Sequence, residues 1–402
     1  MKIIEVGTGY TSIPTKMGAA TEIVVEELSR SLLSYGNEVM VADIRDSNRQ
    51  KCDLPIVEVW VPGFLAGTDV HLGLMHKVKR VTYSVALVRT LKNLIRKSDE
   101  KIILHFHNQY NLFFFLKLVP QKIRKKAILA YTIHSYIWQG EWNAIEQTIR
   151  QRYFQEIVCC EKADVVFALN RDSIKNLQEH TNIVENKLHL IINGVNTDTY
   201  APLDDSEKVM AHRKYNLVGK KVFLQVGSVC DRKNQLEGVR LLLPLLQKDE
   251  SIVYVYAGGI ISPEYQEQIN KYASENGVSK QVIYAGELEP GKPLNEYYNM
   301  ALATVFPSKL EGFSLVVTES LSSGTPVMIS GNSKFDVGAG CLCYRDPEHF
   351  VRLVEAELLN EQKLRENSMY ARENVIKNFS WNKAAGLYLD VFQRLTGKEG
   401  YS

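Results

Sequence analysis

Two glutamates in the C-terminal half stand where a strand gives way to a helix. An apolar run, Ala303 to Phe306, ends at Pro307, and an amphipathic helix is expected from about Ser314. Glu311 therefore lies in the turn, and Glu319 lies on the first turns of the helix. Two carboxylates at this spacing predict a site that spans a polar ligand rather than one that holds a single atom.

The backbone between these glutamates adds a second polar feature. The first amides of a helix have no partner inside the helix, and they lie at the positive end of its dipole. The amides of residues 313–316 should therefore suit a phosphate or a sugar oxygen. The alternative is an ordinary turn with two solvated glutamates, because carboxylates are frequent on exposed surfaces.

The composition limits the class of protein. A chain of 402 residues, 45% hydrophobic and 23% charged, is long enough for two globular domains. The net charge of +2 gives no reason to expect nucleic acid as a partner. No apolar run reaches the ~18 residues of a membrane span, and the chain opens in a strand rather than a signal peptide. We therefore expect a cytoplasmic protein.

The six cysteines predict no chemistry. Their spacing includes no Cys-x-x-Cys pair, so it indicates neither a zinc site nor a disulfide framework. The adjacent Cys159 and Cys160 suit a helix, where they would pack as small apolar residues.

The first residues read as strand, glycine-rich loop and helix, which is the opening of a Rossmann-like unit. The strand Ile3 to Val6 leads to Gly7 and Gly9, and Gly18 precedes the helix. Glycines here would let the backbone approach a ligand. Asp43 follows the second apolar run, where dinucleotide-binding proteins hold a ribose, so this region alone leaves a nicotinamide enzyme open.

Two later apolar strands each end in histidine, at His107 and at His134. The carboxyl ends of strands are where open α/β sheets place ligand groups, and Asn108 lies there too. With His105 these residues could form a metal cluster, but no carboxylate pattern accompanies them. We therefore expect no metal.

The segment 67–101 is basic and amphipathic. Leu87, Val88, Leu91 and Leu94 recur at helical spacing, with lysines and arginines beside them. Such a helix can lie on an anionic membrane. The commoner arrangement is a helix that packs on the core and exposes a solvated face.

The second half of the chain repeats the pattern of the first. An apolar strand ends at Gly227, a turn carries Arg232 and Lys233, and a helix follows from Gln235. Two cations after the strand glycine could offset the charge of a diphosphate leaving group, as a divalent ion does elsewhere. The sequence shows no evident Asp-x-Asp metal motif, which agrees with cations in that role. The alternative is that the arginine and lysine are simply solvated, as such residues in turns ordinarily are.

Together these motifs resemble the retaining, nucleotide-sugar-dependent glycosyltransferases of family 4, group 1. The residues that carry the resemblance are Glu311-Gly-Phe, Glu319, Gly324-Thr-Pro-Val, Thr132-Ile-His134, Asn193-Gly-Val and Lys233. Two positions depart from the family pattern, since the family usually has aspartate at Asn196 and often arginine at Ser228.

The resemblance implies the GT-B fold, an α/β architecture in which two Rossmann-like domains face a central cleft. It implies an acceptor-binding domain over residues 1–190 and a nucleotide-sugar-binding domain over residues 191–378. A C-terminal helix within residues 379–402 would cross back to the first domain.

The resemblance also implies a reaction and its residues. A sugar would move from a UDP- or GDP-linked donor to a hydroxyl of a glycan or lipid-linked acceptor, with retention and without a metal or other cofactor. Glu311 and His134 would be catalytic, while His107 and Asn108 would contact the acceptor. The donor would be bound by Gly18, Ser228, Arg232, Lys233, Glu287, Leu288, Gly312, Phe313, Ser314, Leu315, Val316 and Glu319.

Two alternatives stay open. A nucleotide-sugar epimerase of the same fold would consume no acceptor, and a catalytically silent scaffold would bind nucleotide sugar or membrane only. Many family members act on lipid-linked acceptors, so polysaccharide biosynthesis and peripheral contact with the inner face of the cell membrane are also expected.

Overall fold

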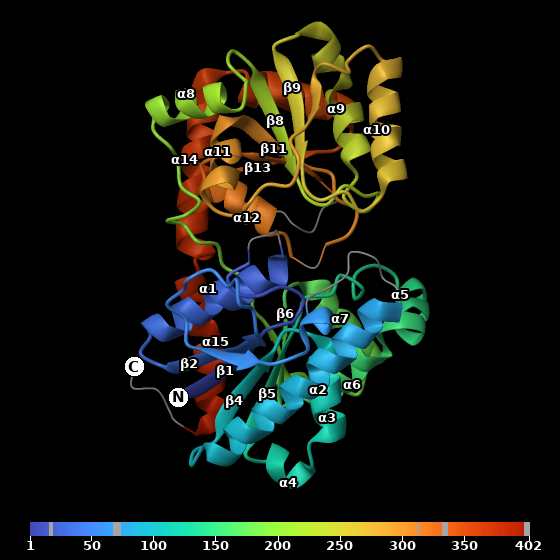
Figure 1. The fold of residues 1–402 in the computed structure, drawn as a ribbon. Helices are drawn as coiled ribbons and strands as arrows, with labels where there is room; N and C mark the ends of the chain where they lie inside the picture. Colours follow the sequence, from blue (N-terminus) through green and yellow to red (C-terminus); the bar gives the residue numbers. More distant parts are fainter. Residues whose placement is uncertain (16–18, 67–73, 312, 332–336, 398–402) are drawn as a thin grey trace. The chain divides into compact units, whose positions relative to one another are not determined.

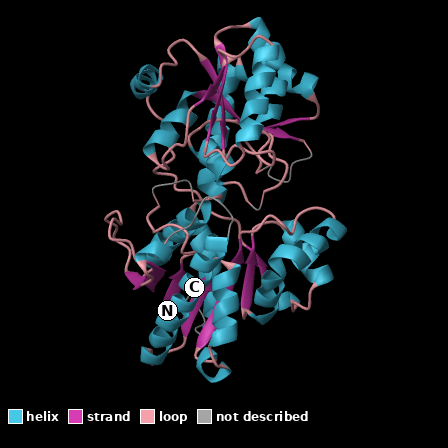
Figure 2. Cartoon of the chain, turned by 45° about the vertical axis from the view of Figure 1, so that its right-hand side comes forward, coloured by secondary structure: helices cyan, strands magenta, loops and turns pink. Residues whose placement is uncertain are grey.

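The computed structural model of the protein describes residues 1–15, 19–66, 74–311, 313–331 and 337–397. The chain divides into two compact units. Unit 1 contains Met1–Thr15, Ala19–Gly194 and the C-terminal segment from Trp381, and unit 2 contains Val195–Ser380. Each unit is a parallel sheet with helices on both faces (Figure 1, Figure 2).

The sheet of unit 1 has seven parallel strands in the order β3-β2-β1-β4-β5-β6-β7. The strands are β1 (Lys2–Val6), β2 (Glu38–Ile44), β3 (Ile56–Val59), β4 (Ile102–Phe106), β5 (Ala127–Ile133), β6 (Val165–Ala168) and β7 (Leu188–Leu190). The central strands are apolar almost throughout because helices bury both faces of a parallel sheet.

Two groups of helices cover this sheet. One face packs against α2 (Leu74–Lys97), α3 (Gln109–Leu118) and α6 (Phe154–Lys162), and the other carries α1 (Ala20–Ser34) and α15 (Trp381–Thr396). The remaining helical segments are η1 (Gly63–Leu65), α4 (Gln121–Arg124), α5 (Trp142–Thr148), the π-helical turn η2 (Ile149–Tyr153), α7 (Arg171–His180) and η3 (Glu185–Lys187). The last helix of the chain therefore belongs to the unit that contains the first strand.

The sheet of unit 2 has six parallel strands in the order β10-β9-β8-β11-β12-β13. The strands are β8 (Lys221–Val226), β9 (Ile252–Ala257), β10 (Val282–Tyr284), β11 (Ala301–Phe306), β12 (Val327–Ser330) and β13 (Cys341–Tyr344). The helices are α8 (Asp205–Lys214), α9 (Gln235–Lys248), α10 (Pro263–Glu275), α11 (Lys292–Met300), α12 (Leu315–Ser322), α13 (Pro347–Leu353), η4 (Val354–Leu358) and α14 (Glu361–Asn378). Separate apolar clusters pack on its two faces.

Both sheets reverse their strand order at one point, between β1 and β4 in unit 1 and between β8 and β11 in unit 2. Open α/β sheets bind ligands outside the carboxyl ends of the strands at such a switch point. The predicted α/β class with two Rossmann-like domains is confirmed, and the topology points to two places in which to look for polar groups.

Two local predictions are also confirmed, for the adjacent cysteines and for the apolar stripe of α2. Cys159 and Cys160 are buried in α6 as apolar residues. Leu87, Val88 and Leu91 face the core from α2. Among the described residues, no helix is both long and apolar enough to cross a membrane.

Candidate functional site

The turn after β8 in unit 2 carries the two predicted cations. Gly227 has a φ of +146°, and a Cβ at this position would lie 3.1 Å from Cε of Lys233. Glycine therefore leaves room for the lysine side chain beside the strand end. The side-chain amide of Gln225 donates to the carbonyl of Lys233 at 2.7 Å, which holds the turn against the strand.

The segment that precedes Glu311 is bonded to this turn. The amide of Lys309 donates to the carbonyl of Arg232 at 2.9 Å, and the guanidinium of Arg232 donates to the carbonyl of Leu310 at 2.8 Å. The loops after β8 and β11 are thus joined by hydrogen bonds at the switch point of unit 2.

Glu311 forms ion pairs with both cations. One of its carboxylate oxygens lies 2.5 Å from Nζ of Lys233 and 3.0 Å from a guanidinium nitrogen of Arg232. The side chains of Glu311 and Lys233 are 9% and 12% exposed, so solvent screens their attraction weakly. The sequence predicted separate roles for these residues, but the structure makes them one cluster. An anionic ligand that binds the cations would compete with Glu311.

Glu319 lies in a different setting, on α12 after the N-cap residue Ser314. Its carboxylate accepts a hydrogen bond from the hydroxyl of the buried Tyr298 at 3.0 Å. Burial, together with the charge of Glu319, raises the pKa of Tyr298 well above its usual value, so the phenol stays a donor. The convergence of Glu311 and Glu319 on one ligand stays a prediction.

Two other predicted donor-binding residues, Gly18 and Gly312, lie outside the described residues. The rest follow strands: Ser228 follows β8, Glu287 and Leu288 follow β10, and Phe313, Ser314, Leu315 and Val316 follow β11. Because the strands are parallel, all these segments lie at the same edge of the sheet as the ion-paired cluster.

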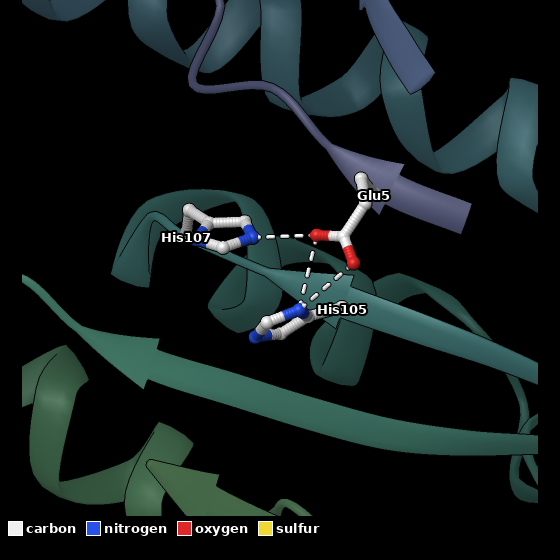
Figure 3. A group of neighbouring side chains, drawn as sticks. All are labelled: Glu5, His105 and His107. Carbon is white, nitrogen blue, oxygen red and sulfur yellow. Dashed lines mark hydrogen bonds and ion pairs between the residues drawn. The ribbon is translucent and has the colours of Figure 1, made fainter. Parts of the chain in front are cut away.

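A chain of polar groups occupies the switch point of unit 1 (Figure 3). Glu5 on β1 is the register partner of His105 on β4, and His107 follows β4 directly. Oε2 of Glu5 lies 2.7 Å from Nε2 of His107 and 3.0 Å from Nδ1 of His105. Nδ1 of His107 lies 2.9 Å from Nε2 of His134, which follows β5. Two predicted site histidines are therefore in contact, and a carboxylate that the sequence reading omitted joins the group.

On the side of His105, the hydrogen-bonded side chains extend to the last helix, α15. Nε2 of His105 lies 2.7 Å from the hydroxyl oxygen of Thr132, which lies 3.3 Å from the hydroxyl of Tyr388 on α15. The rings of Tyr388 and Phe392 contact the ring of His105. The helix α15 thus covers the buried part of the cluster.

The electrostatics of this cluster determine which groups are charged. Burial alone would raise the pKa of Glu5, but attraction and hydrogen bonding from His105 and His107 outweigh it and lower the pKa to about 2. Burial, with repulsion from His105, lowers the pKa of His107 to about 4 despite the nearby Glu5. Burial also places the pKa of His134 well below its usual value. At neutral pH, Glu5 is therefore an anion and His107 and His134 are neutral.

The same group offers metal-ligand atoms. Within the described part of the chain, Glu5, His105 and His107 present three such atoms within 4.8 Å of one another. Two imidazoles and a carboxylate are ligands typical of zinc and of non-haem iron. The sequence argument that no carboxylate accompanies these histidines was wrong, because Glu5, which is distant in the sequence, joins them from the neighbouring strand β1. The expectation that the protein needs no metal stays a prediction.

The two residues predicted to contact the acceptor, His107 and Asn108, lie in different surroundings. His107 is 3% exposed and both of its ring nitrogens are bonded within the protein, which argues against direct contact with an acceptor. Asn108 caps α3 and lines a small pocket between the loop after β1, α2 and α3. The guanidinium of Arg80 lies in the same lining, 3.8 Å from the ring centroid of Tyr110 and 4.7 Å from that of Tyr10. A guanidinium held between two rings is suited to bind an anionic group.

The described part of the glycine-rich loop of unit 1, around Gly7 and Gly9, is packed rather than open. A Cβ at Gly7 would lie 2.7 Å from a carboxylate oxygen of Asp43, and one at Gly9 would overlap the ring of Tyr83. Asp43 is fully buried, accepts the amide of Ile13 at 2.8 Å and pairs with Arg49 at 2.8 Å. Both contacts use Oδ2, and Oδ1 has no hydrogen-bond partner among the described residues. Because the whole carboxylate is buried, Asp43 is not exposed to a ribose in this structure, and the nicotinamide alternative gains no support from it.

Two family models match this chain. The model of glycosyltransferase family 4 matches residues 21–199, and the model of glycosyl transferases group 1 matches residues 210–374. The chain belongs to glycosyltransferase family 4, group 1. The family that the Glu311 motif predicted is confirmed.

Curated relatives of this family 4 chain include the serotype-specific mannosyltransferase WbdA of Escherichia coli, with 28% identity over 260 residues. That match covers 62% of this chain but only 31% of WbdA. The alpha-maltose-1-phosphate synthase of Mycolicibacterium smegmatis is 22% identical, over 90% of this chain and 96% of that protein.

Solved structures share the whole fold with this family 4 chain. Sucrose-phosphate synthase from Thermosynechococcus elongatus superposes with a TM-score of 0.76 at 18% identity, over 99% of this chain and 100% of that one. Anabaena HepE, solved in complex with UDP and glucose, gives 0.72 at 13% identity, over 98% and 100% of the two chains. At these identities the likeness concerns the fold, and the predicted GT-B fold is confirmed.

Proposed function

We propose that this protein transfers a sugar from a nucleoside diphosphate sugar, UDP- or GDP-linked, to a hydroxyl acceptor with retention of the anomeric configuration. The proposal rests on the cluster of Arg232, Lys233 and Glu311 at the switch point of unit 2. Two cations and a carboxylate in contact suit a ligand that joins an anionic diphosphate to a sugar that develops positive charge.

In this reaction the diphosphate displaces Glu311 from Arg232 and Lys233 and also accepts hydrogen bonds from the first amides of α12. Glu311 then orients the sugar hydroxyls and stabilises positive charge at the anomeric carbon. Glu319, held by Tyr298, accepts hydrogen bonds from the ribose. The bond from the anomeric carbon to the phosphate oxygen breaks while the bond to the acceptor oxygen forms on the same face. The leaving phosphate oxygen takes the acceptor proton.

The acceptor binds unit 1 in this proposal. The pocket beside Asn108 contains Arg80, so an acceptor that carries a phosphate or carboxylate near its reacting hydroxyl would gain an ion pair there. A glycan attached to a lipid through phosphate has this chemistry. The curated relatives include a mannosyltransferase, which supports sugar transfer as the reaction.

Product analysis tests the proposal against its two alternatives. Purified protein is incubated with UDP- and GDP-sugars and a mixed panel of sugar acceptors, with and without EDTA. We expect nucleoside diphosphate release that depends on acceptor, a product with the donor's anomeric configuration by NMR, and no loss of rate with EDTA. Epimerised donor without acceptor consumption would favour the epimerase. Binding of nucleotide sugar that raises the melting temperature without turnover would favour the scaffold.

We also propose that α2 brings unit 1 to an anionic membrane surface. Leu74, Val78, Val81 and Val85 repeat at helical spacing on α2 and are all exposed, whereas the core-facing stripe lies elsewhere on the helix. Phe64, on η1 next to α2, is 78% exposed. Lysines and arginines on the same helix supply charge for anionic headgroups.

The variant that carries both Val78→Glu and Val81→Glu should bind anionic vesicles at least about tenfold more weakly than the wild type. Each change removes an apolar contact with lipid and adds a charge that the surface repels. Sedimentation with vesicles of phosphatidylglycerol and phosphatidylcholine measures the effect. Val209→Glu is the matched control, because Val209 is an exposed valine on helix α8 of unit 2. Equal sedimentation of all three proteins would contradict membrane contact through α2.

A further inference from the structure

The contacts of Glu5 determine which atom donates in each hydrogen bond that links Glu5, through His107, to His134. An ionised carboxylate only accepts hydrogen bonds, so the nitrogens that face Glu5 must carry hydrogen. These nitrogens are Nδ1 of His105 and Nε2 of His107. The charge of Glu5 therefore determines which nitrogen of His107 is protonated.

The protonated nitrogen of His107 in turn determines which nitrogen of His134 carries hydrogen. A neutral imidazole carries one hydrogen, so a His107 that donates from Nε2 has a lone pair at Nδ1. Nε2 of His134 lies 2.9 Å from that Nδ1 and must be the donor in this contact. His134, neutral as well, is then left with an unprotonated Nδ1.

We propose that Glu5 and His107 are positioning residues that select the tautomer of His134, so that Nδ1 of His134 accepts a hydrogen bond from a substrate hydroxyl. His134 is the member of this chain that is partly exposed, whereas Glu5 and His107 are buried. The assignment of a sugar or acceptor hydroxyl to His134 rests on the proposed function. The selection of the tautomer does not, because it follows from contacts within unit 1.

Geometry favours hydrogen bonds over a metal at this cluster. Zinc bound to imidazole and carboxylate at ~2.0–2.1 Å in a tetrahedral site holds its ligand atoms roughly 3.3 Å apart. Oε2 of Glu5 and Nε2 of His107 are 2.7 Å apart, which is a hydrogen-bond distance with the proton between them.

A carboxylate is needed at position 5 because an amide would not determine which nitrogen of His107 donates a hydrogen bond. In Glu5→Gln, the side chain offers one acceptor and one donor group. His107 could then accept from the amide at Nε2 and donate from Nδ1, which would reverse His134 as well. A single isosteric substitution in β1 should therefore alter a histidine that it does not touch.

Nitrogen NMR of the ligand-free protein tests the proposal directly. The chain has nine histidines, so long-range proton–nitrogen correlation of ¹⁵N-labelled protein can resolve their rings, with His107→Gln and His134→Gln for assignment. We expect His107 and His134 of the wild type to carry hydrogen at Nε2 only. In Glu5→Gln we expect His134 to show the Nδ1-protonated form as a second or averaged signal. His189→Gln, a change at a half-buried histidine on another strand of unit 1, should leave both rings unchanged.

Three results would overturn the proposal. They are a protonated Nδ1 on His134 in the wild type, unchanged tautomers in a folded Glu5→Gln, and stoichiometric zinc binding to the wild type that removes both ring N–H signals. If Glu5→Gln fails to fold, the wild-type spectrum alone decides. If the protein turns over a nucleotide sugar, kcat of Glu5→Gln should fall about tenfold, the scale of one hydrogen bond, with little change in nucleotide affinity. Without turnover, the spectrum still decides the tautomer.

Discussion

Replacing Glu311 with alanine is expected to reduce sugar transfer about 10³-fold while nucleoside diphosphate binding stays the same or becomes tighter. The carboxylate is assigned to the charge that develops at the anomeric carbon, and removing such a group costs on this scale. The same carboxylate pairs with Arg232 and Lys233, so its loss frees both cations for the diphosphate. Initial rates and calorimetric titration with UDP and GDP measure the two effects.

Glu264→Gln is a matched control for this variant, because Glu264 is an exposed glutamate on α10 of the same unit. Its rate and its affinity should equal those of the wild type. Wild-type turnover by Glu311→Ala would remove Glu311 from the reaction. A large loss of nucleotide affinity would show that Glu311 binds the nucleotide itself rather than competing with it.

Replacing Lys233 with alanine should weaken nucleoside diphosphate binding by about 10- to 100-fold. Lys233 is the less exposed of the two cations, and a hydrogen bond between charged groups is worth about 1.5–3 kcal/mol. Lys233→Arg should recover part of the affinity because it restores the charge. Titration with UDP and GDP at fixed ionic strength measures the change.

Lys309→Ala provides the control for the loss of a positive charge. Lys309 lies in the loop bonded to the same turn, but its amine pairs with Asp231 at 2.8 Å and its side chain is 48% exposed. Its affinity for nucleotide should be close to that of the wild type. Equal weakening by both alanine variants would mean that general charge, rather than the position of Lys233, attracts the nucleotide.

Local patterns in the sequence predicted the elements of this protein well. The strand before Glu311 and the helix after it occur in the structure, as do the strand that ends at Gly227 and the helix from Gln235. Apolar periodicity identifies such elements because burial of one stripe or of a whole strand decides their formation. The pairing of strands far apart in the sequence has no comparable local signal.

The two sites differ in how much of them could be predicted. Arg232, Lys233 and Glu311 follow strand ends within recognisable motifs, so their presence at one sheet edge could be inferred. Glu5 was omitted, although a carboxylate inside an apolar strand is a signal, because a buried charge needs a partner. Its partner His105 lies on β4, and only strand order brings the two residues side by side.

Asp43 shows the opposite error. Its place at the end of the second apolar run suggested a ligand contact, but its carboxylate is buried and one of its oxygens bonds to the amide of Ile13 and to Arg49. Likewise, the expected apolar stripe of α2 faces the core, and the exposed stripe that could meet a membrane is a different set of residues. Residue type and spacing do not reveal which neighbour has already satisfied a group.

The sequence by itself determined the α/β class, the family and the side chains that the strands deliver to their carboxyl ends, because these depend on local periodicity and short motifs. Only the tertiary structure decided that Glu311 pairs with both cations and that Glu5, His107 and His134 form one directed chain of hydrogen bonds. The physical reason is that hydrogen bonds and ion pairs act over about 3 Å, and parallel strand order, rather than distance along the chain, sets which groups come that close.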